Sequence, residues 1–238
     1  MTYPRAASLR PDARPGRAPP GMAPEWQPVR TGAEGRSRWS FVHRLWSHRM
    51  QADVPYESLL EADLITILCV DPEVEGFWAQ PEVFRWRQDG RARRYVPDFL
   101  VLTTAGARTY REVKPLRRLR KDASLGGRRM DIEAECGRRG AMFETWTENE
   151  IRRSPKLENA REILCHAGPV WDEPALAALR RTIREGTHPA TAGELLRSAG
   201  LGPDALGTLL GLVALDELRI EIDQPLSLRS RLVGRRTA

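Results

Sequence analysis

Three residues near the middle of the chain have the types and spacing needed for chemistry on a phosphate. Asp98 follows a proline in the apolar run Val-Pro-Asp-Phe-Leu-Val, and Glu112 and Lys114 follow a short turn later in Arg-Glu-Val-Lys. Phosphodiester hydrolysis is assisted by Mg²⁺, which neutralises phosphoryl charge and lowers the pKa of a bound water. Carboxylates suit that ion, and an amine can hold the attacking water or stabilise the pentacoordinate phosphorus. The three residues therefore predict a metal-dependent nuclease site.

The flanking residues predict how these groups are brought together. Residues 94–103 are rich in β-branched and aromatic types and predict a strand, Ala105-Gly106 predicts a turn, and residues 109–114 predict the hairpin partner. Across such a hairpin, Asp98 and Glu112 are expected to be near neighbours.

Strand alternation places Glu112 and Lys114 on one face and Val113 on the other, against the core. A purely structural explanation exists for each residue. Asp98, inside an apolar strand, could pair with Lys114 or Arg94. Glu112 and Lys114 could be cross-strand charge pairs on an exposed face. The presence of Asp98 beside Glu112 and Lys114 favours a metal-dependent nuclease site over these structural explanations.

A third acid is expected from a helix upstream. Residues 55–68 predict this helix, with Asp53 as its N-cap and Pro55 in the first turn. Glu57 and Glu61 then lie one turn apart on a single flank. The face toward the sheet consists of apolar residues at helical spacing, namely Leu60, Leu64, Ile67 and Leu68.

Either glutamate could reach the metal. Glu61 is favoured because it sits directly beside the buried Leu60 and Leu64, and so nearer the sheet. Glu57 is better explained as an ordinary solvated helix acid that pairs with arginine.

The ordered motifs resemble the TnsA-type endonuclease subunit of heteromeric cut-and-paste transposases. The matching segments span about Gly35 to Ile151 and are Gly35-Arg-Ser, Ser58-Leu-Leu-Glu61, Asp71-Pro-Glu-Val74, Gln80-Pro81, Pro97-Asp98-Phe-Leu-Val and Glu112-Val-Lys114-Pro115. The Pro-Asp and Glu-x-Lys pair alone is shared by a wide nuclease superfamily. The ordered set with Gln80-Pro81 between is much more specific.

The resemblance implies roles for individual residues. Glu61, Asp98 and Lys114 would be the catalytic set, with Glu61, Asp98 and Glu112 as metal ligands for Mg²⁺, for which Mn²⁺ could substitute. Family members differ at the position of Glu112, so this residue would be a further ligand or an orienting group. Glu57 remains a possible further acid. An acid on the following helix is also implied, and the candidates there are Asp131, Glu133 and Glu135.

The resemblance also implies a fold, an activity and partners. The fold would be α/β, with a restriction-endonuclease-like core of a mixed sheet flanked by helices. The protein would hydrolyse the non-transferred (5′) strand at transposon ends in double-stranded DNA. Its partners would be an integrase-type transposase, which cuts and joins the other strand, and an AAA+ transposition regulator.

The charge of the chain agrees with a DNA substrate. Lysine and arginine total 38 against 32 acids, for a net charge of +6 and a pI near 9.7. Arginine forks suit phosphate, and such binding weakens steeply with salt. The expected DNA-binding residues cluster around and after the predicted active strand: Arg111, Arg117, Arg118, Arg120, Lys121, Arg128 and Arg129. The structural alternative is a solvated helical face.

The chain divides into three parts by composition. Residues 1–35 are rich in proline and arginine and predict a disordered arm. Residues 36–154 predict the nuclease domain. Its remaining expected elements are an entry strand at Trp39, Phe41, Leu45 and Trp46, a basic helical region from Leu116 to Gly137 broken near Gly126-Gly127, a closing strand at residues 141–147 and a turn at residues 148–151.

Residues 155–238 predict a small winged-helix-like domain. Three helices are expected at residues 173–185, 191–200 and 203–214, followed by strands at 218–222 and 226–232. The third helix has no lysine or arginine, so protein docking or backbone contact through Arg229 and Arg231 is expected there instead of base reading.

The cysteines and histidines predict no further site. Cys69, Cys136 and Cys165 are odd in number and lack CxxC spacing, which favours a reducing cytoplasm. His43, His48, His166 and His188 show no zinc-ligand pattern. No apolar run predicts a membrane span or a signal peptide, so a cytoplasmic, nucleoid-associated bacterial protein is expected. Two other functions stay open: a stand-alone restriction or repair nuclease of the same fold, and a noncatalytic DNA-binding assembly scaffold.

Overall fold

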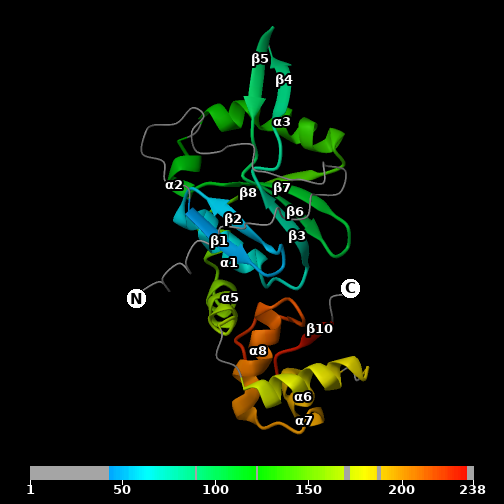
Figure 1. Cartoon of the computed structure of the whole chain (residues 1–238). Coiled ribbons are helices and arrows are strands. Elements are labelled where there is room, and N and C mark those ends of the chain that lie inside the picture. Colours follow the sequence, from blue (N-terminus) through cyan, green and yellow to red (C-terminus); the bar gives the residue numbers. More distant parts are fainter. Residues whose placement is uncertain (1–42, 89, 122, 169–171, 187–188, 235–238) are drawn as a thin grey trace.

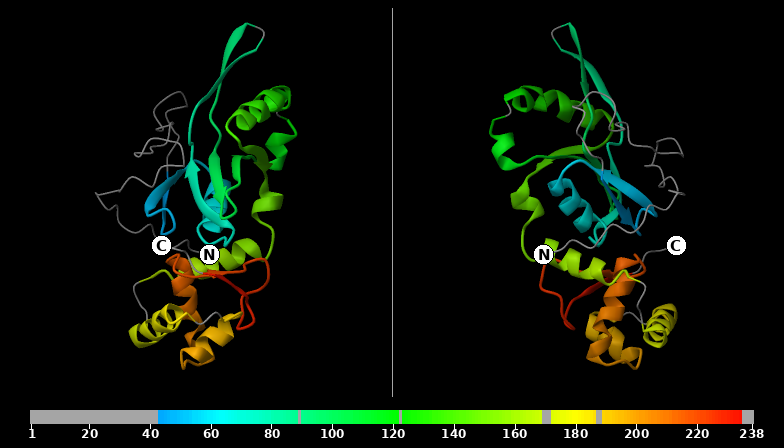
Figure 2. Two further views of the ribbon diagram at one scale, coloured as in Figure 1. Left: turned by 90° about the vertical axis from the view of Figure 1, so that its right-hand side faces the viewer. Right: turned by 60° about the vertical axis from the view of Figure 1, so that its left-hand side comes forward.

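The computed structural model describes residues 43–88, 90–121, 123–168, 172–186 and 189–234. The predicted disordered arm at residues 1–35, together with Trp39 and Phe41, lies outside these residues. Figures 1 and 2 show a sheet-containing upper part, a lower helical part and a hairpin that projects from the top.

The upper part is built around a four-stranded mixed sheet, as expected for an α/β core flanked by helices (Figure 1). The strand order is β3-β6-β7-β8, and only the β7–β8 pair is parallel. The strands are β3 (Val74–Ala79), β6 (Phe99–Thr103), β7 (Arg108–Val113) and β8 (Met142–Trp146). β8 confirms the closing strand expected at residues 141–147.

The hairpin that carries the candidate site forms as expected. β6 and β7 are antiparallel with Phe99 opposite Arg111, and Gly106 turns the chain at φ +83. The single strand predicted at residues 94–103 is wrong, because β5 (Arg91–Tyr95) ends before Asp98 and pairs elsewhere. Pro97 lacks an N–H to donate to a ladder, so the chain changes strand partner there.

Helix α1 (Leu59–Leu68) begins later than expected. Asp53 is not its N-cap and Pro55 is not in its first turn, because both lie in β2 (Ala52–Tyr56), which pairs with β1 (His43–Ser47). A proline disfavours helical backbone in the residue before it, which keeps this segment extended. Ser58 is the N-cap instead, and its side chain accepts from the amide of Glu61.

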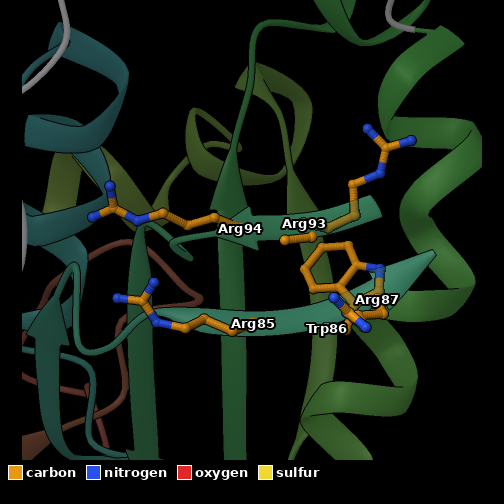
Figure 3. A pocket seen from close by; sticks show the side chains of 6 residues that line it. Arg85, Trp86, Arg87, Arg93 and Arg94 are labelled. Atoms are coloured by element: carbon orange, nitrogen blue, oxygen red, sulfur yellow. The ribbon is translucent and has the colours of Figure 1, made fainter. Parts of the chain in front are cut away.

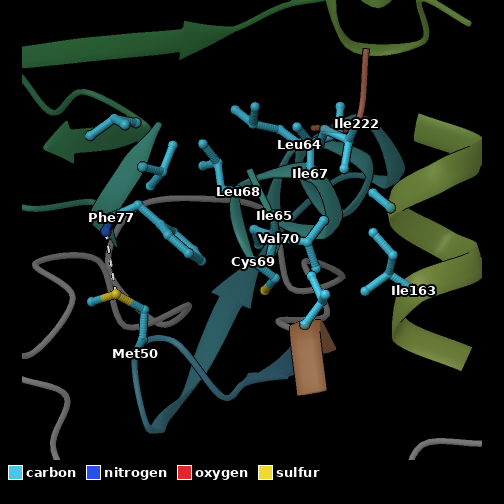
Figure 4. Close-up of a cluster of buried hydrophobic side chains, with 14 of the residues drawn as sticks. Met50, Leu64, Ile65, Ile67, Leu68, Cys69, Val70, Phe77, Ile163 and Ile222 are labelled. Atoms are coloured by element: carbon cyan, nitrogen blue, oxygen red, sulfur yellow. Dashed lines mark hydrogen bonds between the residues drawn. The ribbon is translucent and has the colours of Figure 1, made fainter. Parts of the chain in front are cut away.

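The apolar face of α1 forms the centre of the core. Leu60, Leu64, Ile67 and Leu68 are all buried, as the helical spacing predicts. Figure 4 shows Leu64, Ile67 and Leu68 between Phe77 of β3 on one side and Ile163 on the other. α1 therefore rests on the sheet and holds its first turn near the ends of the central strands.

The basic helical region is divided at a different place from the one expected. α2 (Leu116–Leu119) ends early, and α3 (Ala123–Arg138) continues through Gly126 and Gly127. Glycine costs only about 1 kcal/mol inside a helix, and the buried Ile132 of α3 helps to hold it in place. The turn expected at residues 148–151 is a one-turn helix, α4 (Glu148–Ile151), capped by Thr147.

The lower part contains the three helices expected there and a short β-hairpin. They are α6 (Glu173–Arg184), α7 (Ala192–Ser198) and α8 (Leu206–Ala214), the last preceded by the 3₁₀ turn η1 (Pro203–Ala205), and the hairpin pairs β9 (Arg219–Ile220) with β10 (Leu232–Gly234). The strand predicted at residues 226–232 is wrong. Ser227 and Ser230 close a turn there through hydrogen bonds of 2.8 and 3.0 Å.

Helix α5 (Lys156–Cys165) joins the two parts. It begins where the second domain was predicted to begin, and it packs against both α1 and α8. A buried ion pair crosses the same boundary, since Arg49 Nε lies 3.0 Å from Asp216 Oδ1. None of the helices in the described segments has the length and apolar character needed to cross a membrane.

Candidate functional site

Asp98 and Glu112 meet at one end of the β6–β7 hairpin. Asp98 directly precedes β6, and the register that sets Phe99 opposite Arg111 sets Asp98 beside the last residues of β7. The Asp98 carboxylate accepts a hydrogen bond of 2.8 Å from the amide of Val113. The carboxylate is therefore held against the strand that carries Glu112, as the sequence predicts.

Tyr95 links these two acids to the projecting hairpin. Its hydroxyl donates a hydrogen bond of 2.6 Å to Glu112 Oε2. Burial raises the pKa of Tyr95 well above its usual value, and the charges of Glu112 and Asp98 raise it further. The phenol therefore stays protonated and serves as a neutral donor to a half-buried carboxylate.

Glu61 reaches the same place from the first turn of α1. Its two oxygens accept hydrogen bonds of 2.9 Å each, from the amide of Glu57 and from the hydroxyl of Ser58. Burial raises the pKa of Glu61, those hydrogen bonds oppose the shift, and the charges of Glu57 and Glu112 add to it. The Glu61 carboxyl is thus close enough to Glu112 for the two charges to repel.

Glu57 and Gln80 complete this cluster. Glu57 precedes α1, so the two glutamates do not share a helical flank as predicted. The Gln80 side-chain amide donates to Glu57 Oε1 at 3.0 Å, and the Gln80 backbone amide donates to the Asp98 carbonyl at 2.7 Å. Gln80 adopts a positive φ of +49 and is buried. Its Oε1 atom has no hydrogen-bond partner among the described residues.

Lys114 lies one residue beyond β7. Its backbone amide donates to the Trp146 carbonyl at 3.0 Å, which continues the β7–β8 pairing past the end of the strand. Lys114 is half-buried, and strand alternation places it on the same side as Glu112. Val113 between them is buried, as expected.

The predicted DNA-binding residues occupy two different settings. Arg111 points to the face opposite Glu112, where it is half-buried, lies 3.2 Å from Glu144 and stacks over Trp146. This side chain is engaged within the protein. Exposed residues follow the site along α2 and the next turn, and these are Arg117, Arg118, Arg120 and Lys121.

Several charged side chains of helix α3 pair with neighbours on or next to the same helix. Arg129 pairs with Glu133 at 2.7 Å one turn away. Arg128 and Asp131 of the same helix are both half-buried. Glu135 is buried and hydrogen-bonded to Arg138 and Arg139. Glu133 is exposed and lies next to Arg129, whereas Glu135 is enclosed and held by two arginines.

Two site residues were not predicted as such from the sequence, Tyr95 and Gln80. Gln80 had been noted only as part of a motif, and the signal for Tyr95 lies in the hairpin that carries it. The dipeptide Asp89-Gly90 between two alternating runs is a strong short-range hairpin signal, and it predicts the strand on which Tyr95 lies.

The site offers hard oxygen donors, the kind that Mg²⁺ prefers. In this conformation, no three acid, cysteine or histidine side chains within the described segments are arranged to hold a metal ion. One reason is visible at Glu61, because both of its oxygens cap its own helix.

Comparison with known proteins gives no family assignment: no protein-family model matches the sequence, and no curated protein matches it.

Proposed function

We propose that the protein is a metal-dependent DNA endonuclease. The observation that carries the proposal is the convergence of carboxylates from separate elements: Asp98 before β6, Glu112 on β7 and Glu61 on α1. Burial and the neighbouring charges of Glu57 and Glu112 raise the pKa of Glu61, and half-buried carboxylates brought this close together are costly unless a cation or a proton balances their charge.

The residues present fit a divalent cation by their chemistry. Asp98, Glu112 and Glu61 would hold Mg²⁺ or Mn²⁺, with Glu57 as a possible further acid. The raised pKa of Glu61 and the unpartnered Oε1 of Gln80 both point to a site that gains from a positive charge. A bound Mg²⁺ would supply charge neutralisation at the phosphate and a more acidic water.

The other side chains would position the reacting groups. Lys114, on the side of Glu112, would orient the attacking water or stabilise charge on the phosphorus. Tyr95 fixes Glu112 through its hydroxyl, and the Val113 amide fixes Asp98. Both hydrogen bonds hold a carboxylate in place without neutralising it.

The finer assignment is a TnsA-type subunit of a heteromeric transposase. The mixed sheet flanked by helices is compatible with a restriction-endonuclease-like core, and the helices α6, α7 and α8 with their β-hairpin are compatible with a winged helix. The ordered motifs, with Gln80 now in contact with Glu57, support this proposal. Cleavage of the 5′ strand at transposon ends would then accompany strand transfer by an integrase-type transposase under an AAA+ regulator.

The test is strand cleavage on transposon-end and generic duplex DNA in Mg²⁺, with and without the integrase-type partner. Wild type is compared with Asp98→Ala, Glu61→Ala and Lys114→Ala, and DNA binding is measured for each variant as a control. We expect cutting that requires Asp98 and the partner.

Other outcomes would replace the proposal. Cutting by the protein alone would identify a stand-alone nuclease. If the three variants assembled with partner and DNA like wild type and cut equally well, the enzyme assignment would be wrong. Absence of cutting in every combination would leave a DNA-binding scaffold.

A further inference from the structure

A two-stranded β-ribbon projects from the upper part of the molecule beside the candidate site. Its strands are β4 (Phe84–Gln88) and β5 (Arg91–Tyr95), and they extend well beyond the sheet in every view (Figures 1 and 2). Phe84 is buried at the base, whereas most residues further out are exposed. The outer part of the ribbon therefore presents its side chains to the surroundings of the protein.

Arginine makes up half of the ten strand residues in this ribbon. The residues are Arg85, Arg87, Arg91, Arg93 and Arg94. Neither strand carries an acid, and among the described residues no ion pair joins any of the five arginines to an acid. The ribbon therefore presents concentrated positive charge to its surroundings.

The register places like charges directly against one another. Arg85 lies opposite Arg94 across the ribbon, and Figure 3 shows both side chains extending in the same direction. Like charges directly opposite each other on a sheet destabilise it. An external polyanion bound between the two arginines would offset their repulsion and stabilise the ribbon.

A shallow pocket of about 380 Å³ lies on the ribbon (Figure 3). It is lined by Arg85, Trp86, Arg87, Ala92, Arg93 and Arg94. Two N–H donors there, Trp86 Nε1 and Arg93 Nε, are buried and have no partner within the described segments. Both of these atoms are enclosed in this conformation, and the groups suited to the oxygen acceptors of an outside anion are the exposed guanidinium forks of Arg85, Arg87 and Arg94.

The ribbon is connected to the carboxylate cluster through its second strand. Tyr95 at the base of β5 donates to Glu112, and Asp98 follows three residues later. A molecule held along the ribbon would therefore pass close to the site.

We propose that the β4–β5 ribbon is a DNA-binding arm that holds the backbone of duplex DNA next to the candidate cleavage site. A two-stranded ribbon fits the major groove of B-form DNA, and arginine forks bind phosphate oxygens in pairs. The choice of DNA as the polyanion rests on the proposed nuclease function. The arm is separate from the basic residues that follow the active strand.

Binding in the absence of divalent ions tests the arm without requiring cleavage. Fluorescence anisotropy with a 30-base-pair duplex in EDTA compares full-length wild type with the variant Arg85→Gln/Arg87→Gln/Arg94→Gln. The control variant is Arg181→Gln/Arg184→Gln/Arg197→Gln, which removes equal charge from exposed positions on α6 and α7.

The ribbon variant is expected to bind at least about 30-fold more weakly near 0.1 M salt, and its slope of log K against log salt should flatten by roughly 2 to 3. The control should change binding by less than about 3-fold, because phosphate contacts act locally. The ribbon variant should melt no lower than wild type, since the substitution removes repulsion. Equal losses of DNA affinity in the ribbon and control variants would show that only net charge matters, and would refute the proposed DNA-binding arm.

Two further measurements sharpen the result. Replacing the same three arginines by lysine keeps the charge, so the salt slope should be retained. Duplex RNA has a deep, narrow major groove that a ribbon cannot enter, so the ribbon variant should lose much less affinity for RNA than for DNA. Equal losses on DNA and RNA would contradict groove binding.

The two proposals can fail separately. A ribbon variant that binds normally, in a protein that cuts DNA, would refute the arm and leave the nuclease. A ribbon-dependent affinity in a protein that never cuts would leave the arm and refute the nuclease.

Discussion

Two networks in the upper part of the molecule each join a tyrosine to a half-buried glutamate, yet they balance charge differently. In the first, Tyr95 donates to Glu112, close to Glu61. In the second, which we call the arginine network, Tyr110 donates to Glu82, and Arg139 joins Glu82 to Glu135 at 2.9 and 2.6 Å. The arginine network carries its own cation, whereas the hydrogen bonds described at Glu61 and Glu112 come from neutral donors.

The pKa values of two glutamates express this difference. At Glu135, burial opposes ionisation, but hydrogen bonds from Arg138 and Arg139 outweigh it and lower the pKa. At Glu61, burial and the neighbouring carboxylates outweigh the neutral donors and raise the pKa. A carboxylate held by neighbouring cations keeps a low pKa, whereas one held by neutral donors beside other carboxylates does not. This contrast distinguishes the candidate site from the rest of the charged surface.

The largest expected effect separates the two networks by activity. Asp98→Asn should lower strand cleavage by at least about 10³-fold, because a metal-binding carboxylate acts as part of a catalytic unit. Glu82→Gln should leave cleavage within about 3-fold of wild type, since it alters only the arginine network. Single-turnover cleavage with the partner present measures both. Equal losses of cleavage rate in Asp98→Asn and Glu82→Gln would mean that the two networks do not differ in their role in cleavage.

The next effect is on stability and belongs to the arginine network. Arg139→Met removes the cation shared by Glu82 and Glu135, and should lower the free energy of unfolding by roughly 2 to 3 kcal/mol. The exposed Arg138→Met is the control and should cost about 1 kcal/mol or less. Urea unfolding at neutral pH measures both changes. If Arg139→Met lowered the free energy of unfolding less than Arg138→Met, Arg139 would not be the main cation of the arginine network.

A pH dependence of opposite sign is expected at the half-buried Glu61 and the buried Glu135. The raised pKa of Glu61 means that its ionisation costs stability as pH rises from about 4.5 through the folded-state pKa. The free energy of unfolding of Glu61→Gln should therefore rise relative to that of wild type as pH rises across that window. Because the pKa of Glu135 is lowered in the folded protein, its ionisation stabilises the fold above about pH 4.5, and this stability is lost as pH falls through the folded-state pKa. The free energy of unfolding of Glu135→Gln should therefore fall relative to wild type as pH rises across that window.

Urea unfolding of the three proteins at intervals from pH 3.5 to 7.5 checks this prediction, and only the differences between proteins are compared. If Glu61→Gln and Glu135→Gln followed the same trend, the two networks would not differ in charge balance.

The β6–β7 hairpin and the α1 core face could be predicted because their signals are local. Alternation, a turn glycine and helical spacing lie within single segments, and the pairing of Asp98 with the end of β7 follows from them. The start of α1 could not be placed correctly, because Pro55 is equally compatible with a first helical turn and with the strand that it occupies. That choice was made by pairing with β1, which is a tertiary contact.

The candidate site was predicted less completely than the fold around it. Glu61 and Glu112 were found because they lie in motifs, but their mutual proximity depends on how α1 packs on the sheet. Gln80 was missed as a functional group because its role rests on two contacts distant in sequence, with Glu57 and with Asp98. Arg111 was expected to bind DNA, yet side-chain alternation turns it toward Glu144.

The smallest expected effect comes from the two tyrosines and tests the comparison most directly. Tyr95→Phe and Tyr110→Phe each remove one hydrogen bond to a glutamate, and each should lower the free energy of unfolding by about 1 kcal/mol. The stability difference between Tyr95→Phe and wild type should be smaller in Mg²⁺ than in EDTA, since an ion bound beside Glu112 would hold that carboxylate in place of the lost hydroxyl. The difference between Tyr110→Phe and wild type should be the same in Mg²⁺ and in EDTA, because this variant leaves the proposed ion site unchanged and Arg139 already contacts Glu82. Thermal melting in EDTA and in Mg²⁺ measures both differences, and an equal reduction in both variants would mean that the two networks are electrostatically alike.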